Sequence, residues 1–258
     1  MLFKSSKRYN RYIHLLWCTV RPGQFKKMHK IWMRRAVFKE AIKTYVAVNS
    51  TEHASNLQKY LRKEYLLVLN IDRIGVCYPA YILSKGLGVH FGRVAKDDIV
   101  ILASDDFIPP KRWDVYLDKK LKDKSEACLL VRDGYQEPDS GNTTGAAITI
   151  PILTVPCLLA LNRIIYHPAY THMFSDCELY SNVKEMNLLV DDRFNDETAF
   201  YHIHHSNRKR KSDFFDHVHA TNWGKDREVW LQRQSLTLEE RLRTPEVEGE
   251  QAIQLIAR

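Results

Sequence analysis

The stretch Ile99-Val-Ile-Leu-Ala-Ser-Asp-Asp-Phe-Ile-Pro-Pro110 joins an apolar run to two adjacent carboxylates and a proline break. The run predicts a buried strand over residues 99–103 that ends abruptly at Ser104-Asp105-Asp106. Adjacent carboxylates repel each other, so a protein keeps them together where both are hydrated or where a cation neutralises them. The stretch therefore predicts either a site for a hard cation at the end of a strand, or a turn that caps the helix after Arg112.

Strand and helix patterns alternate on the amino-terminal side of this stretch. Strands are expected at residues 12–18, 44–48 and 65–69, and helices at 24–37, 54–63 and 80–87. This alternation predicts an α/β fold with a mixed, mostly parallel sheet flanked by helices, in which ligands lie beyond the carboxyl ends of the strands.

The second half is less regular. Its pattern predicts a helix over 112–122, a strand over 127–131, a helix over 176–187, a strand pair at 188–190 and 198–202, a last helix after Gly224 and a frayed acidic tail after Thr244. The polar loop over 134–145 is a candidate lid or acceptor contact. The expected domains are residues 1–224, divided near residue 110, and a carboxyl-terminal extension over 225–258.

Composition restricts the class of protein. The chain has 258 residues, of which 45% are hydrophobic, and its net charge is +8. Residues 1–43 hold twelve Lys and Arg against one acid, Glu40, so the basic character belongs to the amino-terminal region. This region could bind nucleic acid, an anionic membrane or substrate phosphates, or it could simply be a solvated face. The five cysteines are widely spaced, which indicates reduced residues in the core. The sequence has no apolar run that is long and uninterrupted enough to predict a membrane span. A cytoplasmic location is therefore expected.

The segment over residues 99–114 resembles the DxD-type metal segment of GT-A glycosyltransferases, particularly family 2, and the resemblance extends over most of residues 12–205. It implies a Rossmann-like GT-A domain and a divalent cation, Mn²⁺ or Mg²⁺, held by Asp106 with help from Asp105. In the segment Phe200-Tyr-His-Ile-His-His205, the resemblance assigns the third metal contact to His202, with His204 as its substitute. The basic run over 208–211 is either an anion pocket or an exposed turn.

The segment Phe174-Ser-Asp-Cys-Glu-Leu-Tyr180 resembles the family segment that carries the catalytic base, and Asp176 is the matching carboxylate. A base is needed because an alcohol is a poor nucleophile until its proton is removed. Ser175 and Glu178 also have capping-box spacing, so Glu178 is expected to cap the helix, whereas Asp176 could both favour the helix dipole and act as the base.

The resemblance also suggests nucleotide contacts. Arg21 and Lys85 are candidates for the diphosphate, while Thr19 and Pro22 would shape the loop under the nucleotide base. Family members usually place an Asp after the second strand, where this chain has the turn Asn49-Ser-Thr-Glu52, so Asn49 is the candidate at that position.

The expected function is transfer of a sugar from a nucleotide-diphosphate sugar, most simply a UDP-sugar, to an acceptor hydroxyl with inversion. The acceptor is either a hydroxymethylated pyrimidine in phage DNA, with the protein then in the host cytoplasm, or a saccharide or lipid-linked glycan. Two alternatives stay open. A noncatalytic nucleic-acid-binding protein would explain the basic leader, and a histidine-rich metallohydrolase could use His202, His204, His205, His217 and His219, although no HxHxDH or HExxH arrangement is present.

Overall fold

The computed structural model describes residues 11–61, 65–68, 75–91, 93–134, 147–195, 199–203, 211, 221–244 and 254–256. Its strands are β1 (Ile13–Thr19), β2 (Ile42–Val48), β3 (Tyr65–Val68), β4 (Ile99–Ala103), β5 (Phe107–Ile108), β6 (Cys128–Leu130), β7 (Ile152–Thr154), β8 (Leu189–Asp191), β9 (Tyr201–His202) and β10 (Gln254–Ile256). Its helices are α1 (Pro22–Arg35), the 3-10 turn η1 (Lys39–Ala41), α2 (Thr51–Gln58), α3 (Cys77–Gly86), α4 (Trp113–Leu121), α5 (Val155–Ala160), α6 (Ser175–Glu185), α8 (Trp223–Gln234) and α9 (Leu238–Arg241).

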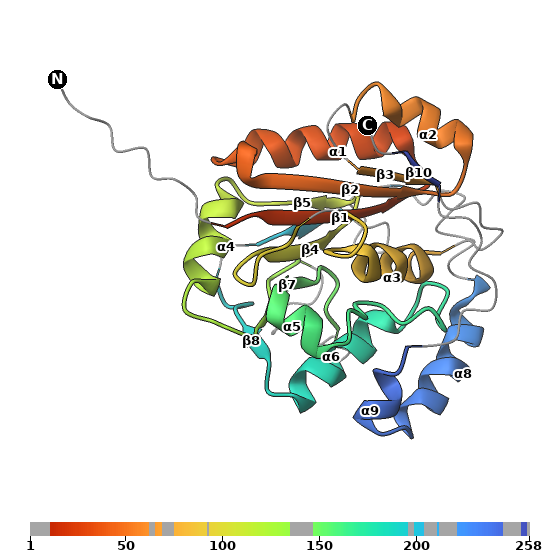
Figure 1. The fold of residues 1–258 in the computed structure, drawn as a ribbon. Helices are drawn as coiled ribbons and strands as arrows, with labels where there is room; N and C mark the ends of the chain where they lie inside the picture. Colours follow the sequence, from red (N-terminus) through yellow and green to blue (C-terminus); the bar gives the residue numbers. More distant parts are fainter. Residues whose placement is uncertain are drawn as a thin grey trace.

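A central sheet organises the molecule (Figure 1). Within the described residues its strand order is β10-β3-β2-β1-β4-β7-β6-β8. The neighbouring pairs β3–β2, β2–β1, β1–β4 and β6–β8 are parallel. Strand β10 pairs antiparallel with β3, and β7 pairs antiparallel with both β4 and β6. The expected mixed, mostly parallel α/β sheet is therefore confirmed. The chain leaves β1 towards β2 on one side and returns to β4 on the other, so the direction of winding changes between β1 and β4.

Each face of the sheet has its own apolar core because strand side chains alternate. From β1, Ile13, Leu15 and Trp17 pack with α1, α2 and α4 on one face. Leu16 packs with α3, α5 and α6 on the other. In Figure 1, α1 and α2 lie above the sheet and α3, α5 and α6 lie below it, while α4 is seen at its left edge. All five residues of β4 are buried, which agrees with a strand that is covered on both faces.

Two expectations about the second half are wrong, and one strand was missed. The strands near 188–190 and 198–202 do not pair with each other, because β8 joins β6 and β9 joins β5. The acidic tail is not frayed throughout, since Gln254–Ile256 forms β10 against β3. Strand β7 was not expected, and it inserts between β4 and β6.

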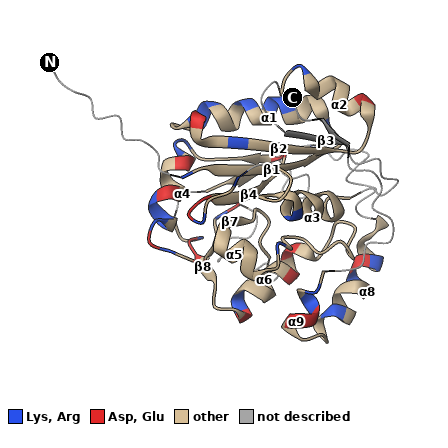
Figure 2. Cartoon of the chain, viewed as in Figure 1, with Lys and Arg blue, Asp and Glu red and all other residues tan. Residues whose placement is uncertain are grey.

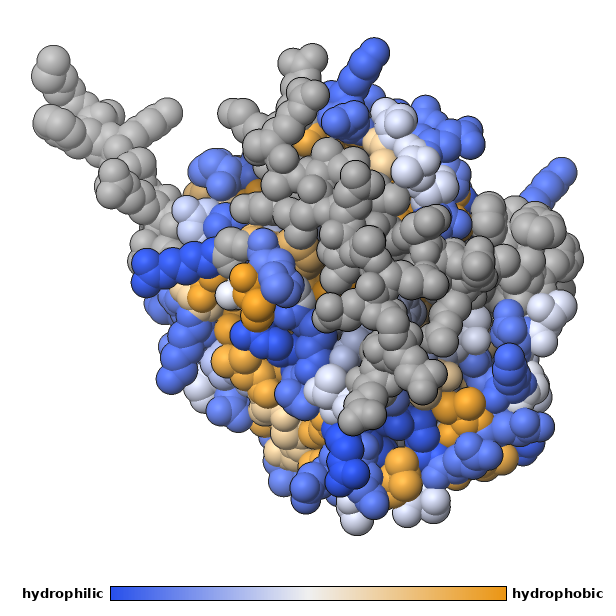
Figure 3. Space-filling model, turned by 45° about the vertical axis from the view of Figure 1, so that its right-hand side comes forward, coloured by the Kyte–Doolittle hydropathy of each residue, from blue (hydrophilic) through white to orange (hydrophobic). Residues whose placement is uncertain are grey.

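On the face drawn in Figure 3, the orange apolar patches among the coloured residues are interspersed with hydrophilic side chains. Large apolar side chains that are exposed include Phe194, Trp223 and Leu231. In the part of the chain that the structure describes, no helix is both long and apolar enough to cross a membrane.

Candidate functional site

The candidate site lies at the carboxyl edge of β1 and β4, where the winding of the sheet changes direction (Figure 1). Thr19 is the last residue of β1, and Asp105 follows the end of β4 by two residues. The Oγ1 of Thr19 donates a hydrogen bond of 3.1 Å to Oδ2 of Asp105 and so ties the two strand ends together. In open α/β sheets, ligands usually bind beyond the carboxyl ends of the strands at such a switch point.

Asp105 is held by the loop between β1 and α1. The guanidinium of Arg21 binds both oxygens, with Nη2 2.8 Å from Oδ1 and Nε 3.3 Å from Oδ2. Gln24 Nε2 donates to the backbone carbonyl of Asp105, and Pro22 begins α1 in the first helical turn, where its missing N–H costs nothing. Burial raises the pKa of Asp105 to about 6, against the opposing charge of Arg21. Arg21, expected at the diphosphate, is thus paired with Asp105 in this structure.

Asp106 faces a histidine from the opposite half of the chain. Its Oδ2 lies 3.3 Å from Nε2 of His202, and Ser104 Oγ donates to its Oδ1 at 2.6 Å. Burial opposes ionisation, but the hydrogen bond and charge of His202 prevail and hold the pKa of Asp106 below its usual range. A buried carboxylate that stays ionised at neutral pH is a suitable cation ligand.

A two-stranded ribbon positions His202. Strands β5 and β9 pair antiparallel with Phe107 opposite His202, and the two rings stack with centroids 4.2 Å apart. The backbone N–H of Ile203 donates to the carbonyl of Asp106 at 2.7 Å. The chain segment that follows the Asp pair therefore supplies the strand that places the histidine.

Asp176 is the second residue of α6 and is partly buried. Its own carbonyl accepts a hydrogen bond from Ile148 N–H, and its Oδ1 accepts one from Cys177 N–H. Burial raises the pKa of Asp176 above its ordinary value, and the charge of His202 acts in the opposite direction. A carboxylate with a raised pKa is suited to accept a proton.

The structure does not bring every expected residue to this place. Lys85 lies in the last turn of α3, and its Nζ donates to Thr244 Oγ1 at 2.8 Å. Asn49 follows Val48, the last residue of β2 and the register partner of Thr19, and its Oδ1 lies 2.8 Å from His53 Nδ1. His204, His205, His217, His219 and residues 208–210 lie outside the described residues, as does the expected lid apart from Gly134.

The capping box expected at Ser175 and Glu178 is wrong. The residue before α6 is Phe174, in a left-handed conformation with φ 65°, and it makes no side-chain cap. Glu178 is buried and forms a two-pronged ion pair with Arg233 of α8, while Tyr170 donates to its Oε2. The spacing of Ser175 and Glu178 gave a wrong prediction because the carboxylate of Glu178 binds Arg233, which is 55 residues away in sequence.

Asp133 was missed. It follows β6, is 2% exposed, and accepts a 2.8 Å hydrogen bond from Thr149 Oγ1, while its carbonyl accepts from the N–H of His202. A carboxylate directly after a predicted strand was the signal that identified Asp105 and Asp106, and the sequence Val131-Arg-Asp-Gly134 carries the same signal. Asp133 thus brings a further acid to the same edge of the sheet.

The donors fit a hard divalent cation. One carboxylate, Asp106, and one imidazole, His202, face each other, with Asp105 adjacent and engaged by Arg21. Within the described residues no three His, Cys, Asp or Glu side chains lie together as a set that could hold a metal ion, so Asp105, Asp106 and His202 do not form a three-ligand group here. Mg²⁺ and Mn²⁺ suit such an open set, because these ions take one or two protein carboxylates and complete their shell with water and substrate phosphates.

Comparisons with known proteins define the class of fold. No family model and no curated protein matches the sequence. Among solved structures, Staphylococcus aureus TarS 1-349 in complex with UDP-GlcNAc matches with a TM-score of 0.57 at 14% identity, over 74% of this chain and 58% of that chain. The mannosyltransferase PcManGT from Pyrobaculum calidifontis, in complex with GDP-Man and Mn²⁺, matches with a TM-score of 0.54 at 10% identity, over 75% of this chain and 57% of that chain.

The fold is therefore that of the GT-A glycosyltransferases, as the resemblance implied. The chain spans less than two thirds of the length of these neighbours, and only 36% of the longer TarS chain.

Proposed function

We propose that this chain is a metal-dependent glycosyltransferase that takes its sugar from a nucleotide-diphosphate sugar. The observation that carries the proposal is the pair formed by Asp106 and His202, next to Asp105, at the β1–β4 switch point of a GT-A fold. The two solved neighbours support it, since one holds UDP-GlcNAc and the other GDP-Man with Mn²⁺. A UDP-sugar is the simplest donor on this basis.

Asp106 and His202 would hold Mn²⁺ or Mg²⁺, with Asp105 beside them. When bound, the cation neutralises negative charge that grows on the diphosphate leaving group. Thr19, Pro22 and Asn49 lie at the carboxyl ends of β1 and β2 and would form the floor under the nucleoside. Arg21 keeps Asp105 in place, and a diphosphate that binds here competes with Asp105 for the same guanidinium.

Asp176 would accept the proton of the acceptor hydroxyl as that oxygen attacks the anomeric carbon. The O–H bond breaks as the new glycosidic bond forms, and the bond to the diphosphate breaks on the opposite side, which inverts the configuration. The raised pKa of Asp176 supports this role, because a base is most effective when its pKa approaches the working pH.

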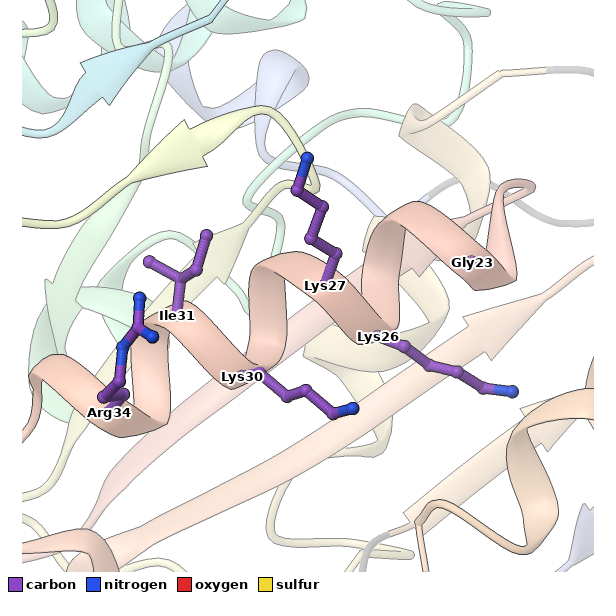
Figure 4. Close-up of a pocket in the computed structure, with 6 residues that line it drawn as sticks. All are labelled: Gly23, Lys26, Lys27, Lys30, Ile31 and Arg34. Atoms are coloured by element: carbon purple, nitrogen blue, oxygen red, sulfur yellow. The ribbon is translucent and has the colours of Figure 1, made fainter.

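The acceptor is proposed to be DNA. Helix α1 carries no acidic residue in its first turn and presents Lys26, Lys27, Lys30 and Arg34 around a shallow hollow of about 660 Å³ (Figures 2 and 4). This basic face starts one turn after Arg21, so a polyanion lying on it would approach the site. A hydroxymethylated pyrimidine would supply the acceptor hydroxyl, and the protein would then act in the cytoplasm.

DNA binding is tested by fluorescence anisotropy of a duplex oligonucleotide over a series of salt concentrations. In the double variant Lys27→Glu/Lys30→Glu, the slope of log affinity against log salt is expected to fall by about 2, because two phosphate contacts are lost. The matched control, Lys122→Glu/Lys124→Glu, changes two exposed lysines of another helix end. An equal loss in both double variants would contradict a DNA face on α1 and leave a saccharide or lipid-linked acceptor.

Transfer itself is tested by screening sugar nucleotides for Mn²⁺-dependent release of nucleoside diphosphate. Asp106→Asn is expected to lose nucleotide binding that depends on metal, whereas Asp176→Asn keeps binding and loses turnover. Normal turnover in Asp176→Asn would contradict the assignment of the base. Zinc retention without nucleotide binding would instead favour a metallohydrolase.

A further inference from the structure

The helices α8 and α9 clasp the chain segment that carries Asp176. In Figure 1 they lie beside α6, although 37 residues of sequence separate the end of α6 from the start of α8. Their contacts converge on the loop over residues 171–174, which leads directly into α6, and on α6 itself.

Asp226 of α8 makes the central contact. It is 1% exposed, and its carboxylate accepts three consecutive backbone N–H groups, those of Thr171, His172 and Met173, each at 2.8 Å. Three successive amides that point to one anion form a concave site of the kind that binds phosphates elsewhere. Here a side chain of the protein occupies it, so the backbone path of the loop is fixed by a buried negative charge.

A second contact fixes α6. Arg233, two helical turns after Asp226, binds Glu178 with two hydrogen bonds of 2.8 Å, and Tyr170 donates to the same carboxylate at 2.7 Å. Between these two contacts the ring of Phe174 stacks on Trp230, with centroids 5.5 Å apart. The left-handed φ of Phe174 marks the sharp bend that this packing maintains.

The other side of the loop is closed by the start of α3. Gly75 has φ +151°, and a Cβ at this position would lie 2.0 Å from the carbonyl oxygen of Thr171. The N–H of Cys77 reaches the same oxygen at 3.4 Å, and its thiol donates to Ser175 Oγ. The loop is thus held between α8 and the start of α3, and its last residue, Phe174, lies two positions before the proposed base.

We propose that Asp226 and Arg233 are positioning residues for the transfer step, because they fix the entry into α6 and with it the place of Asp176. This inference rests on the proposed function. Within the described residues, neither side chain is hydrogen-bonded or ion-paired to Asp106 or His202, so the binding of metal and nucleotide should not depend on them. What they set is the alignment of Asp176 with the acceptor, and a displacement of about 1 Å there can cost about a hundredfold in rate.

The test compares Asp226→Asn with the matched control Glu228→Gln, which neutralises an exposed acid of the same helix. Asp226→Asn keeps the volume of the side chain, but its NH₂ group replaces one carboxylate oxygen and so faces a backbone N–H, which cannot accept a hydrogen bond from it. The kcat of sugar transfer is expected to fall about a hundredfold, while the KM for the sugar nucleotide and its Mn²⁺-dependent affinity change less than about twofold. Arg233→Lys keeps the charge of Arg233 but loses the two-pronged geometry, and should lower kcat in the same way.

Hydrogen exchange provides a readout that does not need activity. The amides of residues 171–173 should exchange slowly in the wild-type chain and about tenfold to a hundredfold faster in Asp226→Asn, as expected for the loss of hydrogen bonds to a charged group, and they should be unchanged in Glu228→Gln.

An unaltered kcat in both Asp226→Asn and Arg233→Lys, or a parallel loss of kcat and nucleotide affinity in a folded variant, would overturn the proposal. If Asp226→Asn does not fold, Arg233→Lys decides it by the same measurements. If the wild-type chain transfers no sugar, the proposed function fails, and exchange alone then decides whether the loop is clamped: equal exchange in wild type and Asp226→Asn rejects the clamp.

Discussion

Asp105 should make the protein less stable as the pH rises. Its pKa is about 6 in the folded chain and 3.8 ordinarily, because burial disfavours the carboxylate more than Arg21 favours it. Between these two values the folded state holds a proton that the unfolded state has released, so stability falls with rising pH. At 1.36 kcal/mol per pH unit, the contribution lost between about pH 4 and pH 7 is about 3 kcal/mol.

The variant Asp105→Asn removes this titration and keeps the shape of the side chain. Urea unfolding followed by tryptophan fluorescence would be measured for both chains from pH 4 to pH 7.5, with the buried Trp17, Trp32 and Trp113 as probes. The difference in unfolding free energy between wild type and variant should shift by about 3 kcal/mol across that range, in favour of the variant at high pH. Parallel pH curves for the two chains would refute the reasoning, since they would show that Asp105 titrates alike in both states.

Three further predictions concern the stability of the fold, and each is measured as a free energy of unfolding in urea. Trp32→Phe removes the 2.8 Å hydrogen bond to the carbonyl of Phe107 and should cost about 1–3 kcal/mol at a buried acceptor. Gly75→Ala forces a Cβ against the carbonyl of Thr171 at a φ unfavourable to alanine, and should cost about 3 kcal/mol. Burial opposes the charge of Asp98, yet the hydrogen bond from His14 lowers its pKa, so the stability lost in Asp98→Asn at pH 7 should diminish as the pH falls below 3.8. A loss that is the same at pH 3 and pH 7 would contradict the last of these.

The elements with a strong local signal were predicted well. The strand expected at 99–103 is β4 to the residue, and the strand expected at 12–18 is β1 shifted by one position. Both are apolar runs that end at residues unsuited to a buried strand, so hydrophobicity alone locates them. The approach of His202 to Asp106 was suggested by resemblance, whereas the ribbon that achieves it pairs residues 95 positions apart.

The elements without such a signal were missed because tertiary contacts define them. Strand β7 lies in an apolar run flanked by Pro151 and Pro156, which shows no period-two alternation. Its identity as a strand comes from β4 and β6, between which it is inserted. The capping box predicted from the three-residue spacing of Ser175 and Glu178 failed for a similar reason, because Glu178 pairs with Arg233 from a helix far along the chain.

Calorimetric titration of the full chain with UDP, in the presence and absence of Mn²⁺, tests the cation site at Asp106 and His202 most directly. Binding should require Mn²⁺ in the wild-type chain, disappear in Asp106→Asn, and persist in Asp118→Asn, where the neutralised acid pairs with Arg11 at the opposite edge of the sheet. Equal Mn²⁺-dependent binding in wild type and Asp106→Asn would contradict the account.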